Sequence, residues 1–454
     1  MKFKDIVNIP CGIRFCFEDL SIEAGYSRRV ALDAPLMTSV EQIEASYGDL
    51  RLFRALNASN PSLIRDVKHY LQCSLHDISG ALKTLRNGDY LEDINLFEIK
   101  NLAILGDNIG KLFSAHGVDI KWLDFPMSRV IDILDPDGLR IASFYIYDSY
   151  SIELRTLRQE LEYFNGDDDE RSALMDDIAT EEDRIREIIA GKLLPLADDI
   201  EGMLHSLARL DIAIAKAAQA EKWNLVIPEH GDKTILEGMY NPEIEDALQK
   251  KRKAFQRVNF LHQNGEPSVV IGANMGGKTV ALKTLTLCQL LYQTGFAVPA
   301  EKAVMHPFEE IYFCIGDEQD QIKGLSSFAA EMLRINQVIE RMREGVSILA
   351  LIDEPARTTN PVEGTALVSA LVNLISGREN IDLVLTTHYN IKCGAQVAFW
   401  RVRGLVEGKM DYELLPTAGH KVPHEALAIA ESLKIDSQWI NGAKEMLERQ
   451  KTTV

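Results

Sequence analysis

The sequence predicts an all-α N-terminal part followed by an α/β C-terminal part. From about residue 51 to 222, glycine and proline are sparse and apolar residues recur at three- and four-residue steps, as in Leu204, Leu207 and Leu210. That spacing is typical of amphipathic helices. From 223 to 454, short Val/Ile-rich runs alternate with helix-like stretches. This second pattern indicates a buried, mainly parallel sheet that is covered by helices.

The length and composition are those of a globular protein. The chain has 454 residues, of which 46% are hydrophobic and 26% charged, which suffices for two or three domains. No apolar run could span a bilayer and the N-terminus lacks the apolar core of a signal peptide, so we expect no membrane association and a cytoplasmic location. The six cysteines form no C-x-x-C pair, which argues against disulfides and a zinc site. The formal net charge of −19 argues against a broad nucleic-acid surface without excluding a local basic patch.

The chain divides into three predicted segments. Residues 1–50 mix short apolar runs with turn signals, and the pattern around Phe15–Leu20 does not distinguish helix from strand. Residues 51–222 form the helical domain. Residues 223–454 form the α/β domain, and Trp223–Pro228 resembles a strand that enters it.

The helical domain contains one clear interruption. Asn165-Gly-Asp167 is a turn signal, so we place a helix–helix tip near 164–170, as in a lever or an antiparallel coiled-coil arm. Between Glu160 and Asp183, eleven residues are acidic and only Arg171 is basic. The stretch is either a solvated helical hairpin or a docking face for a basic partner.

Four apolar runs in the α/β domain predict buried strands that lie in one sheet. They are Ser268–Ile271, Glu310–Cys314, Ile348–Ile352 and Ile381–Thr386.

The first of these runs leads into a motif. Residues 272–279 read Gly-Ala-Asn-Met-Gly-Gly-Lys-Thr, and a helix-like run follows from Val280. This is the phosphate-binding pattern G-x-x-x-x-G-K-[ST] in its strand–loop–helix context, which predicts a P-loop NTPase. Glycines allow backbone N–H groups to surround a phosphate, the lysine charge suits β- and γ-phosphates, and the threonine hydroxyl can hold Mg²⁺. The predicted nucleotide-binding residues are Gly272, Asn274, Met275, Gly276, Gly277, Lys278, Thr279 and Val280.

Carboxylates end the run Ile348–Ile352. Asp353 at the strand tip can bind Mg²⁺ directly or through water, and Glu354 can orient the attacking water or accept its proton. His388 follows the run that ends at Thr387 and could sense the γ-phosphate, although a lone histidine is also common as a structural residue.

A helix is predicted to begin near Phe328, within the segment 316–332. Ser326 or Ser327 could cap that helix, with Glu331 helping as in a capping box. The same geometry would also offer donors to an anion, such as the γ-phosphate held by a second subunit.

Taken in order, four runs resemble the MutS family of ABC-type ATPases. They are Gly272–Thr279, Gly324–Met332, Asp353-Glu-Pro-Ala-Arg-Thr-Thr359 with Glu363-Gly364, and Thr387-His-Tyr389. Gly295-Phe-Ala-Val-Pro-Ala300 and Gly316-Asp-Glu-Gln319 are closer to the second bacterial MutS type than to the classical mismatch-repair type. The resemblance is close over about 225–445 and weaker in the helical part.

The resemblance implies a dimeric ATPase that uses ATP and Mg²⁺ in two composite sites. Lys278 would be catalytic together with Glu354 and His388, and Thr279 and Asp353 would hold the metal. Ser326 would be the signature serine that completes the partner's site in trans. Residues of about 423–450 are similar to the family's helix–turn–helix dimerisation element, although a plain terminal helix pair fits the same periodicity.

The sequence also departs from the family. From the length of the chain we expect neither the mismatch-reading domain nor the nuclease domain of the second type, and the arm tip is acidic where the family's clamp meets DNA phosphates. Arg357-Thr-Thr359 stands in place of Arg-Gly-Thr, and Tyr240-Asn-Pro242 in place of Arg-His-Pro.

Two functional hypotheses follow from these observations. The first is a MutS-like ATP-hydrolysing homodimer whose nucleotide cycle opens and closes a helical arm on DNA, in mismatch repair or recombination. The alternative is an ATP-dependent protein remodeller, such as a reactivating factor for a cobalamin-dependent aminomutase, that binds a protein partner and no DNA. The sequence does not locate the nucleobase contacts beyond the neighbourhood of Val258–Phe260.

Overall fold

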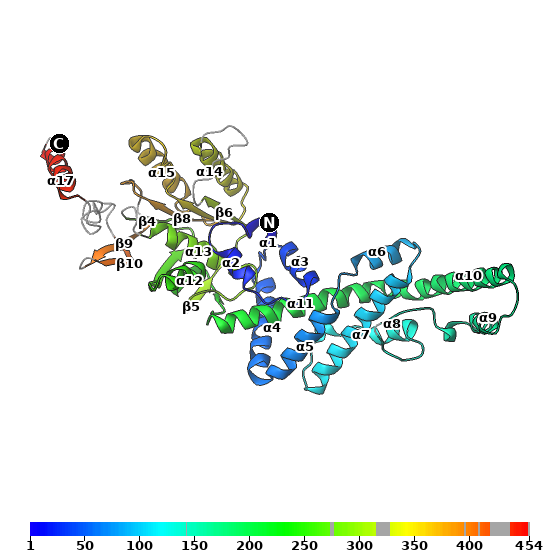
Figure 1. The fold of residues 1–454 in the computed structure, drawn as a ribbon. Coiled ribbons are helices and arrows are strands. Elements are labelled where there is room, and N and C mark those ends of the chain that lie inside the picture. The colour runs from blue at the N-terminus through cyan, green and yellow to red at the C-terminus, as the bar shows by residue number, and fades with distance from the viewer. Residues whose placement is uncertain are drawn as a thin grey trace. The chain divides into compact units, whose positions relative to one another are not determined.

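The computed structural model describes residues 1–141, 143–272, 277–314, 327–394, 396–406, 409–417 and 436–452. Its internal contacts divide the chain into two compact units. The sheet unit comprises residues 1–20, 34–49 and 219–454, and the helical unit comprises residues 21–33 and 50–218. The chain passes between the two units within helices α4 (Val40–Ser59) and α11 (Ala197–Lys222) (Figure 1).

A six-stranded sheet forms the core of the sheet unit, with the order β10-β9-β4-β8-β7-β6. Neighbours from β9 to β6 run parallel, and β10 pairs antiparallel with β9. The strands are β4 (Ser268–Ile271), β6 (Glu310–Cys314), β7 (Ile348–Asp353), β8 (Ile381–Thr387), β9 (Ala398–Val406) and β10 (Lys409–Pro416). The four predicted strands are confirmed as β4, β6, β7 and β8, and the predicted α/β character is confirmed with them.

Helices cover both faces of this sheet (Figure 1). Helices α14 (Ser327–Arg343) and α15 (Pro361–Ile375) share a buried apolar cluster with strand residues such as Ile352 and Leu383. On the opposite face, Leu282 and Leu285 of α13 (Lys278–Tyr292) lie beside Val270 and Val384. Because side chains on both faces are buried, β7 and β8 are continuous apolar runs rather than alternating ones.

A second sheet of four strands has the order β1-β5-β2-β3. Its strands are β1 (Glu229–His230), β2 (Lys233–Met239), β3 (Val258–Gln263) and β5 (Lys302–Met305), and helix α12 (Pro242–Lys250) follows β2. The predicted strand at Trp223–Pro228 was wrong, because only Val226 forms an isolated bridge, with Val298. The apolar residues of that segment pack as an irregular connection, which an apolar run alone cannot distinguish from a strand.

The first fifty residues are divided between the two units. Helices α1 (Phe3–Ile6) and α2 (Ile13–Glu18) belong to the sheet unit, and α3 (Gly25–Asp33) belongs to the helical unit. The ambiguous stretch Phe15–Leu20 is therefore mostly helical. Within the sheet unit, the Tyr47 hydroxyl donates to the Phe296 carbonyl at 3.0 Å, and Gln219 Nε2 donates to the Cys16 carbonyl at 2.7 Å.

The helical unit is built from amphipathic helices and short 3₁₀ turns. The helices are α5 (Pro61–Ser74), α6 (Ser79–Asn87), α7 (Asp93–Ala115), α8 (Met127–Leu134), α9 (Ile152–Glu162) and α10 (Asp168–Leu193), and the turns are η1 (Lys121–Leu123), η2 (Asp148–Tyr150) and η3 (Leu194–Leu196). The apolar stripe Leu204, Leu207 and Leu210 on α11 is buried, as its helical spacing predicts.

Helices α9 and α10 pack against each other, and residues 163–167 connect them. Ser151 and Asp167 cap their N-termini, since their side chains accept hydrogen bonds from Leu154 N and Glu170 N. Arg158 of α9 pairs with Glu182 of α10 at 2.7 Å. Most of the acidic side chains around the connection are exposed to solvent, including 167–170.

The C-terminal helix α17 spans Ser437–Thr452. The rest of the predicted dimerisation element, from about 423 to 435, lies outside the described residues. No helix in the described part of the chain is both long and apolar enough to cross a membrane.

A buried ion pair organises the helical unit. Lys100 of α7 is 1% exposed, and its Nζ contacts Asp135 Oδ1 at 3.0 Å, the Tyr147 hydroxyl at 2.8 Å and the Ser143 carbonyl at 3.2 Å. One lysine thus holds the segment that follows α8 against α7. Removing one partner of a buried pair leaves the other charge without compensation.

We therefore predict that Lys100→Met lowers the free energy of unfolding of the helical unit by about 3–5 kcal/mol. Lys111→Met is the matched control, because Lys111 lies on the same helix and pairs with Asp107 while its side chain is 67% exposed. The control should lose at most about 0.5 kcal/mol. Urea unfolding followed by circular dichroism measures both, and equal losses would contradict the assignment of a structural role to the buried pair.

Candidate active site

The site begins where β4 leads toward α13. Gly277 precedes the helix with a φ of 82°, and Lys278 and Thr279 are the first residues of α13. Lys278 is 4% exposed, and its Nζ donates to the Gly272 carbonyl at 2.9 Å. Three of the predicted nucleotide-binding residues, Asn274, Met275 and Gly276, lie outside the described residues.

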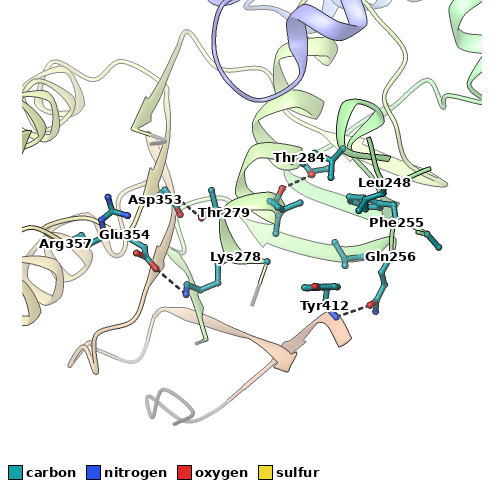
Figure 2. A pocket seen from close by; sticks show the side chains of 16 residues that line it. Leu248, Phe255, Gln256, Lys278, Thr279, Thr284, Asp353, Glu354, Arg357 and Tyr412 are labelled. Atoms are coloured by element: carbon teal, nitrogen blue, oxygen red, sulfur yellow. Dashed lines mark hydrogen bonds and ion pairs between the residues drawn. The ribbon is translucent and has the colours of Figure 1, made fainter. Parts of the chain in front are cut away.

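Two carboxylates at the end of β7 meet these helix residues (Figure 2). Thr279 Oγ1 donates to Asp353 Oδ2 at 2.8 Å, and the hydroxyl of Thr386 on β8 donates to Asp353 Oδ1 at 2.5 Å. Lys278 Nζ lies 3.3 Å from Glu354 Oε1. The parallel register of β4, β8 and β7 brings these groups together, because parallel strands place their carboxyl ends at one edge.

Glu354 occupies an unusual backbone conformation. Its φ is 48° and that of Ala356 is 58°, in the left-handed region that costs a non-glycine residue about 1–2 kcal/mol. The Glu354 N–H donates to the Thr386 carbonyl at 3.2 Å and to the Thr386 hydroxyl at 3.0 Å. The neighbouring strand β8 therefore holds the turn that presents the Glu354 carboxylate.

His388 lies near the same oxygen of the Glu354 carboxylate that Lys278 contacts. Its Nδ1 is 3.8 Å from Glu354 Oε1, and its ring centroid is 4.4 Å from that of Tyr389. Nδ1 is buried without a hydrogen-bond partner among the described residues. The structure thus places Lys278, Glu354 and His388 in one cluster, whereas Ser326 lies outside the described residues.

A pocket of about 590 Å³ opens beside this cluster. Figure 2 shows that Lys278, Asp353, Glu354 and Arg357 gather at one end and that aromatic and apolar side chains line the other. The apolar end comprises Ile244, Leu248, Phe255, Val258 and Tyr412. The cavity can therefore accommodate a ligand that is anionic at one end and flat and apolar at the other.

Most residues of the apolar end were not identified from the sequence. Of the segment Val258–Phe260, in which we expected nucleobase contacts, Val258 lines the pocket. Phe260 is buried and does not line it. Gln256 connects its own segment with strand β10, because it donates to Asp411 Oδ1 at 2.7 Å and accepts from Tyr412 N at 3.0 Å. Phe255 and Tyr412 are far apart in the chain, so no local motif marks them, and only the antiparallel strand β10 brings Tyr412 into place.

The predicted cap of α14 stays a prediction, because Ser326 and the side chain of Ser327 lie outside the described residues. The helix begins at Ser327, and the carboxylate of Glu331, its fifth residue, accepts a hydrogen bond from Ala356 N at 3.1 Å.

The arrangement of the site indicates the general class of the domain. A lysine and a threonine at the start of a helix, facing strand-end carboxylates across a parallel sheet, are characteristic of α/β nucleotide-binding domains. A family model, MutS domain V, matches residues 268–405, the segment that carries the described lysine, threonine and both carboxylates. Over this segment the chain is similar to the MutS family.

Curated relatives agree with this family. Endonuclease MutS2 of Thermus thermophilus is 33% identical over 278 residues, which cover 59% of this chain and 35% of that protein. Endonuclease MutS2 of Enterococcus faecalis is 29% identical over 275 residues, with 58% and 34% covered. Endonuclease MutS2 of Finegoldia magna is 31% identical over 274 residues, with 59% and 34% covered. The chain thus matches about a third of the length of each of these relatives.

A glycine substitution tests the pocket geometry. A Cβ on Gly277 would lie 2.8 Å from Tyr412 Cδ1, in addition to the positive φ. We predict that Gly277→Ala weakens binding of a fluorescent ATP analogue by about tenfold or more, because the strain and the contact together exceed about 1.4 kcal/mol.

Gly345→Ala is the matched control. Gly345 has a φ of 84°, and a Cβ there would meet nothing within 4 Å. The control should lose about 1 kcal/mol of unfolding free energy and keep its nucleotide affinity. Unchanged affinity in the Gly277→Ala variant would contradict the assignment of the pocket.

Proposed function

We propose that the sheet unit binds ATP with Mg²⁺ and hydrolyses it. The observation that supports this proposal most is that Lys278, Thr279, Asp353 and Glu354 lie together at the charged end of one pocket. The match to MutS domain V also supports ATPase activity, because homologues with this domain are ATPases. In the proposal, Lys278 binds the β- and γ-phosphates and Glu354 orients the attacking water and accepts its proton.

The residues present fit a magnesium ion. Thr279 Oγ1 and Asp353 Oδ2 are 2.8 Å apart, and hydroxyl and carboxylate oxygens are ligands that Mg²⁺ prefers. No group of three or more His, Cys, Asp or Glu side chains among the described residues could hold a metal by itself. This agrees with an ion that takes its remaining ligands from phosphate and water. When bound, Mg²⁺ would neutralise charge on the phosphate oxygens.

The other pocket residues take complementary roles. The apolar end, with Phe255 and Tyr412, suits a nucleobase, which stacks on aromatic rings. His388 Nδ1 is buried and faces Glu354 at 3.8 Å, which supports a role in sensing the state of the γ-phosphate. In the free site, the Lys278–Glu354 contact compensates the buried lysine charge until a phosphate replaces it.

We further propose that the chain acts as a homodimer. On the resemblance to ABC-type ATPases, Ser326, which precedes α14 in the sequence, completes the partner's nucleotide site, and residues of about 423–450 add to the interface. In this proposal ATP stabilises the closed dimer and hydrolysis releases it, so that the nucleotide cycle drives a helical arm.

We propose that the arm acts on DNA, since the matched relatives are named endonucleases. The exposed carboxylates at 167–170 repel phosphates. Any DNA contact would therefore avoid the connection between α9 and α10. If DNA does not change the ATPase rate, the alternative is that the arm binds a protein with a basic surface.

Glu354→Gln tests the hydrolytic mechanism. We predict that kcat falls by about 100-fold or more, because general-base catalysis contributes about 10²–10⁴, while ATP affinity is retained. Light scattering should then show a dimer that persists with ATP. Glu379→Gln, an exposed position before the amino end of β8, is the control with wild-type turnover. Normal turnover in Glu354→Gln would contradict the mechanism, and a monomer with bound ATP would contradict the ATP-stabilised dimer.

DNA action has its own test. We predict that homoduplex, mismatched or branched DNA changes the ATPase rate of the wild-type chain and that the effect declines with salt, as expected for phosphate contacts. The measurement compares steady-state rates at two salt concentrations. If no DNA changes the rate or binds below micromolar concentrations at moderate salt, the DNA proposal is wrong and a protein partner is favoured.

A further inference from the structure

The backbone of Ala356 is held by side chains from two different elements. Its N–H donates to Glu331 Oε2 of α14 at 3.1 Å, and its carbonyl accepts from the hydroxyl of Tyr389, just after β8, at 2.8 Å. Ala356 is 1% exposed. The carbonyl also accepts from Thr359 N at 3.3 Å. Specific side chains thus contact both polar groups of this buried backbone unit, and the Glu331 carboxylate is the acceptor of its N–H.

This unit follows Glu354 closely in the same strained turn. The φ values of Glu354 and Ala356 are 48° and 58°, and such residues persist only where their surroundings hold them. Thr386 holds the Glu354 end of the turn, and Glu331 and Tyr389 hold the Ala356 end. Without the second anchor, the turn would be free to relax toward ordinary backbone angles and to move the Glu354 carboxylate.

The surroundings of Glu331 make its contact specific. The side chain is half-buried, and the next apolar residues of α14, Met332 and Ile335, pack on the core of the sheet unit. Burial raises the pKa of the Glu331 carboxyl, while the hydrogen bond from Ala356 and the charge of Arg357 oppose that change. A carboxylate in such a place needs the Ala356 N–H as its partner.

Tyr389 is equally constrained. A Cβ on Gly364 of α15 would lie 2.6 Å from the Tyr389 hydroxyl oxygen. The absence of a side chain at Gly364 thus leaves room for the hydroxyl to reach the Ala356 carbonyl. Glu331 and Tyr389 bind the N–H and the carbonyl of the same residue, Ala356, so the loss of either contact should loosen the turn.

We propose that Glu331 is a positioning residue that fixes the Glu354 carboxylate through the Ala356 N–H. The inference rests on the proposed function, in which Glu354 orients water and the N-terminus of α14 meets the partner's nucleotide. Glu331 lies one helical turn after Ser327. The contact therefore connects the helix that would sense the partner subunit with the turn that carries out hydrolysis.

The test uses the full chain and four variants, with steady-state ATPase kinetics and ATP affinity as readouts. Glu331→Ala should lower kcat by about tenfold or more, since small displacements of a reacting group can reduce rates up to about 100-fold, with KM changed less than about twofold. Glu331→Gln should retain most of kcat, because its amide oxygen can accept the same hydrogen bond. Tyr389→Phe should also lower kcat at constant KM.

Glu340→Ala is the matched control, because Glu340 lies on the same helix, is exposed and contacts only Asn336 among the contacts described. It should behave as the wild type. Wild-type kcat in Glu331→Ala would overturn the inference, as would a Glu331→Gln variant as slow as Glu331→Ala. If Glu331→Ala fails to fold, Tyr389→Phe decides, and an unchanged kcat overturns the inference. A wild-type chain without ATPase activity would instead overturn the proposed function itself.

Discussion

The contact between Lys278 and Glu354 is the constraint on which the rest of the site depends. Lys278 is nearly fully buried, and its Nζ lies 3.3 Å from the Glu354 carboxylate. An ammonium group in that position requires a partner, since an isolated buried charge costs many kcal/mol. The Lys278 Nζ thus lies beside the Glu354 carboxylate, at the end of the pocket where we propose that phosphate binds. The parallel order of β4, β8 and β7 makes the contact possible.

The strained turn after β7 gives this contact its precision. Glu354 and Ala356 adopt backbone angles that neither residue prefers, and three side chains, Thr386, Glu331 and Tyr389, hold them there. Thr386 and Tyr389 come from β8 and the residues that follow it, and Glu331 comes from α14. The position of the Glu354 carboxylate therefore depends on how β8 and α14 pack. A shift of α14 would move the carboxylate that we propose to act in hydrolysis.

Much of this site could be predicted from the sequence because its signals are local. Lys278 and Thr279 belong to a contiguous motif, and Asp353 and Glu354 directly end an apolar run. Parallel strands bring such ends together, so the proximity of the four residues follows from the fold class. The strands that carry them read as continuous apolar runs for the same reason.

The remaining residues could not be predicted because long-range packing determines them. Tyr412 reaches the pocket only through the antiparallel pairing of β10, and Glu331 accepts a hydrogen bond from Ala356, which is 25 residues away in the chain. The segment Trp223–Pro228 has the composition of a strand, but it finds no neighbour with which to form a ladder beyond one bridge. Periodicity reports burial, and burial alone does not specify hydrogen-bond partners.

The most direct measurement of the central claim is a crystal structure of the chain with Mg²⁺ and a non-hydrolysable ATP analogue. We predict that Lys278 Nζ leaves Glu354 for the β- and γ-phosphates, that Mg²⁺ lies against Thr279 Oγ1, and that the base occupies the end lined by Phe255 and Tyr412. A nucleotide bound elsewhere, with the Lys278–Glu354 contact intact, would contradict it.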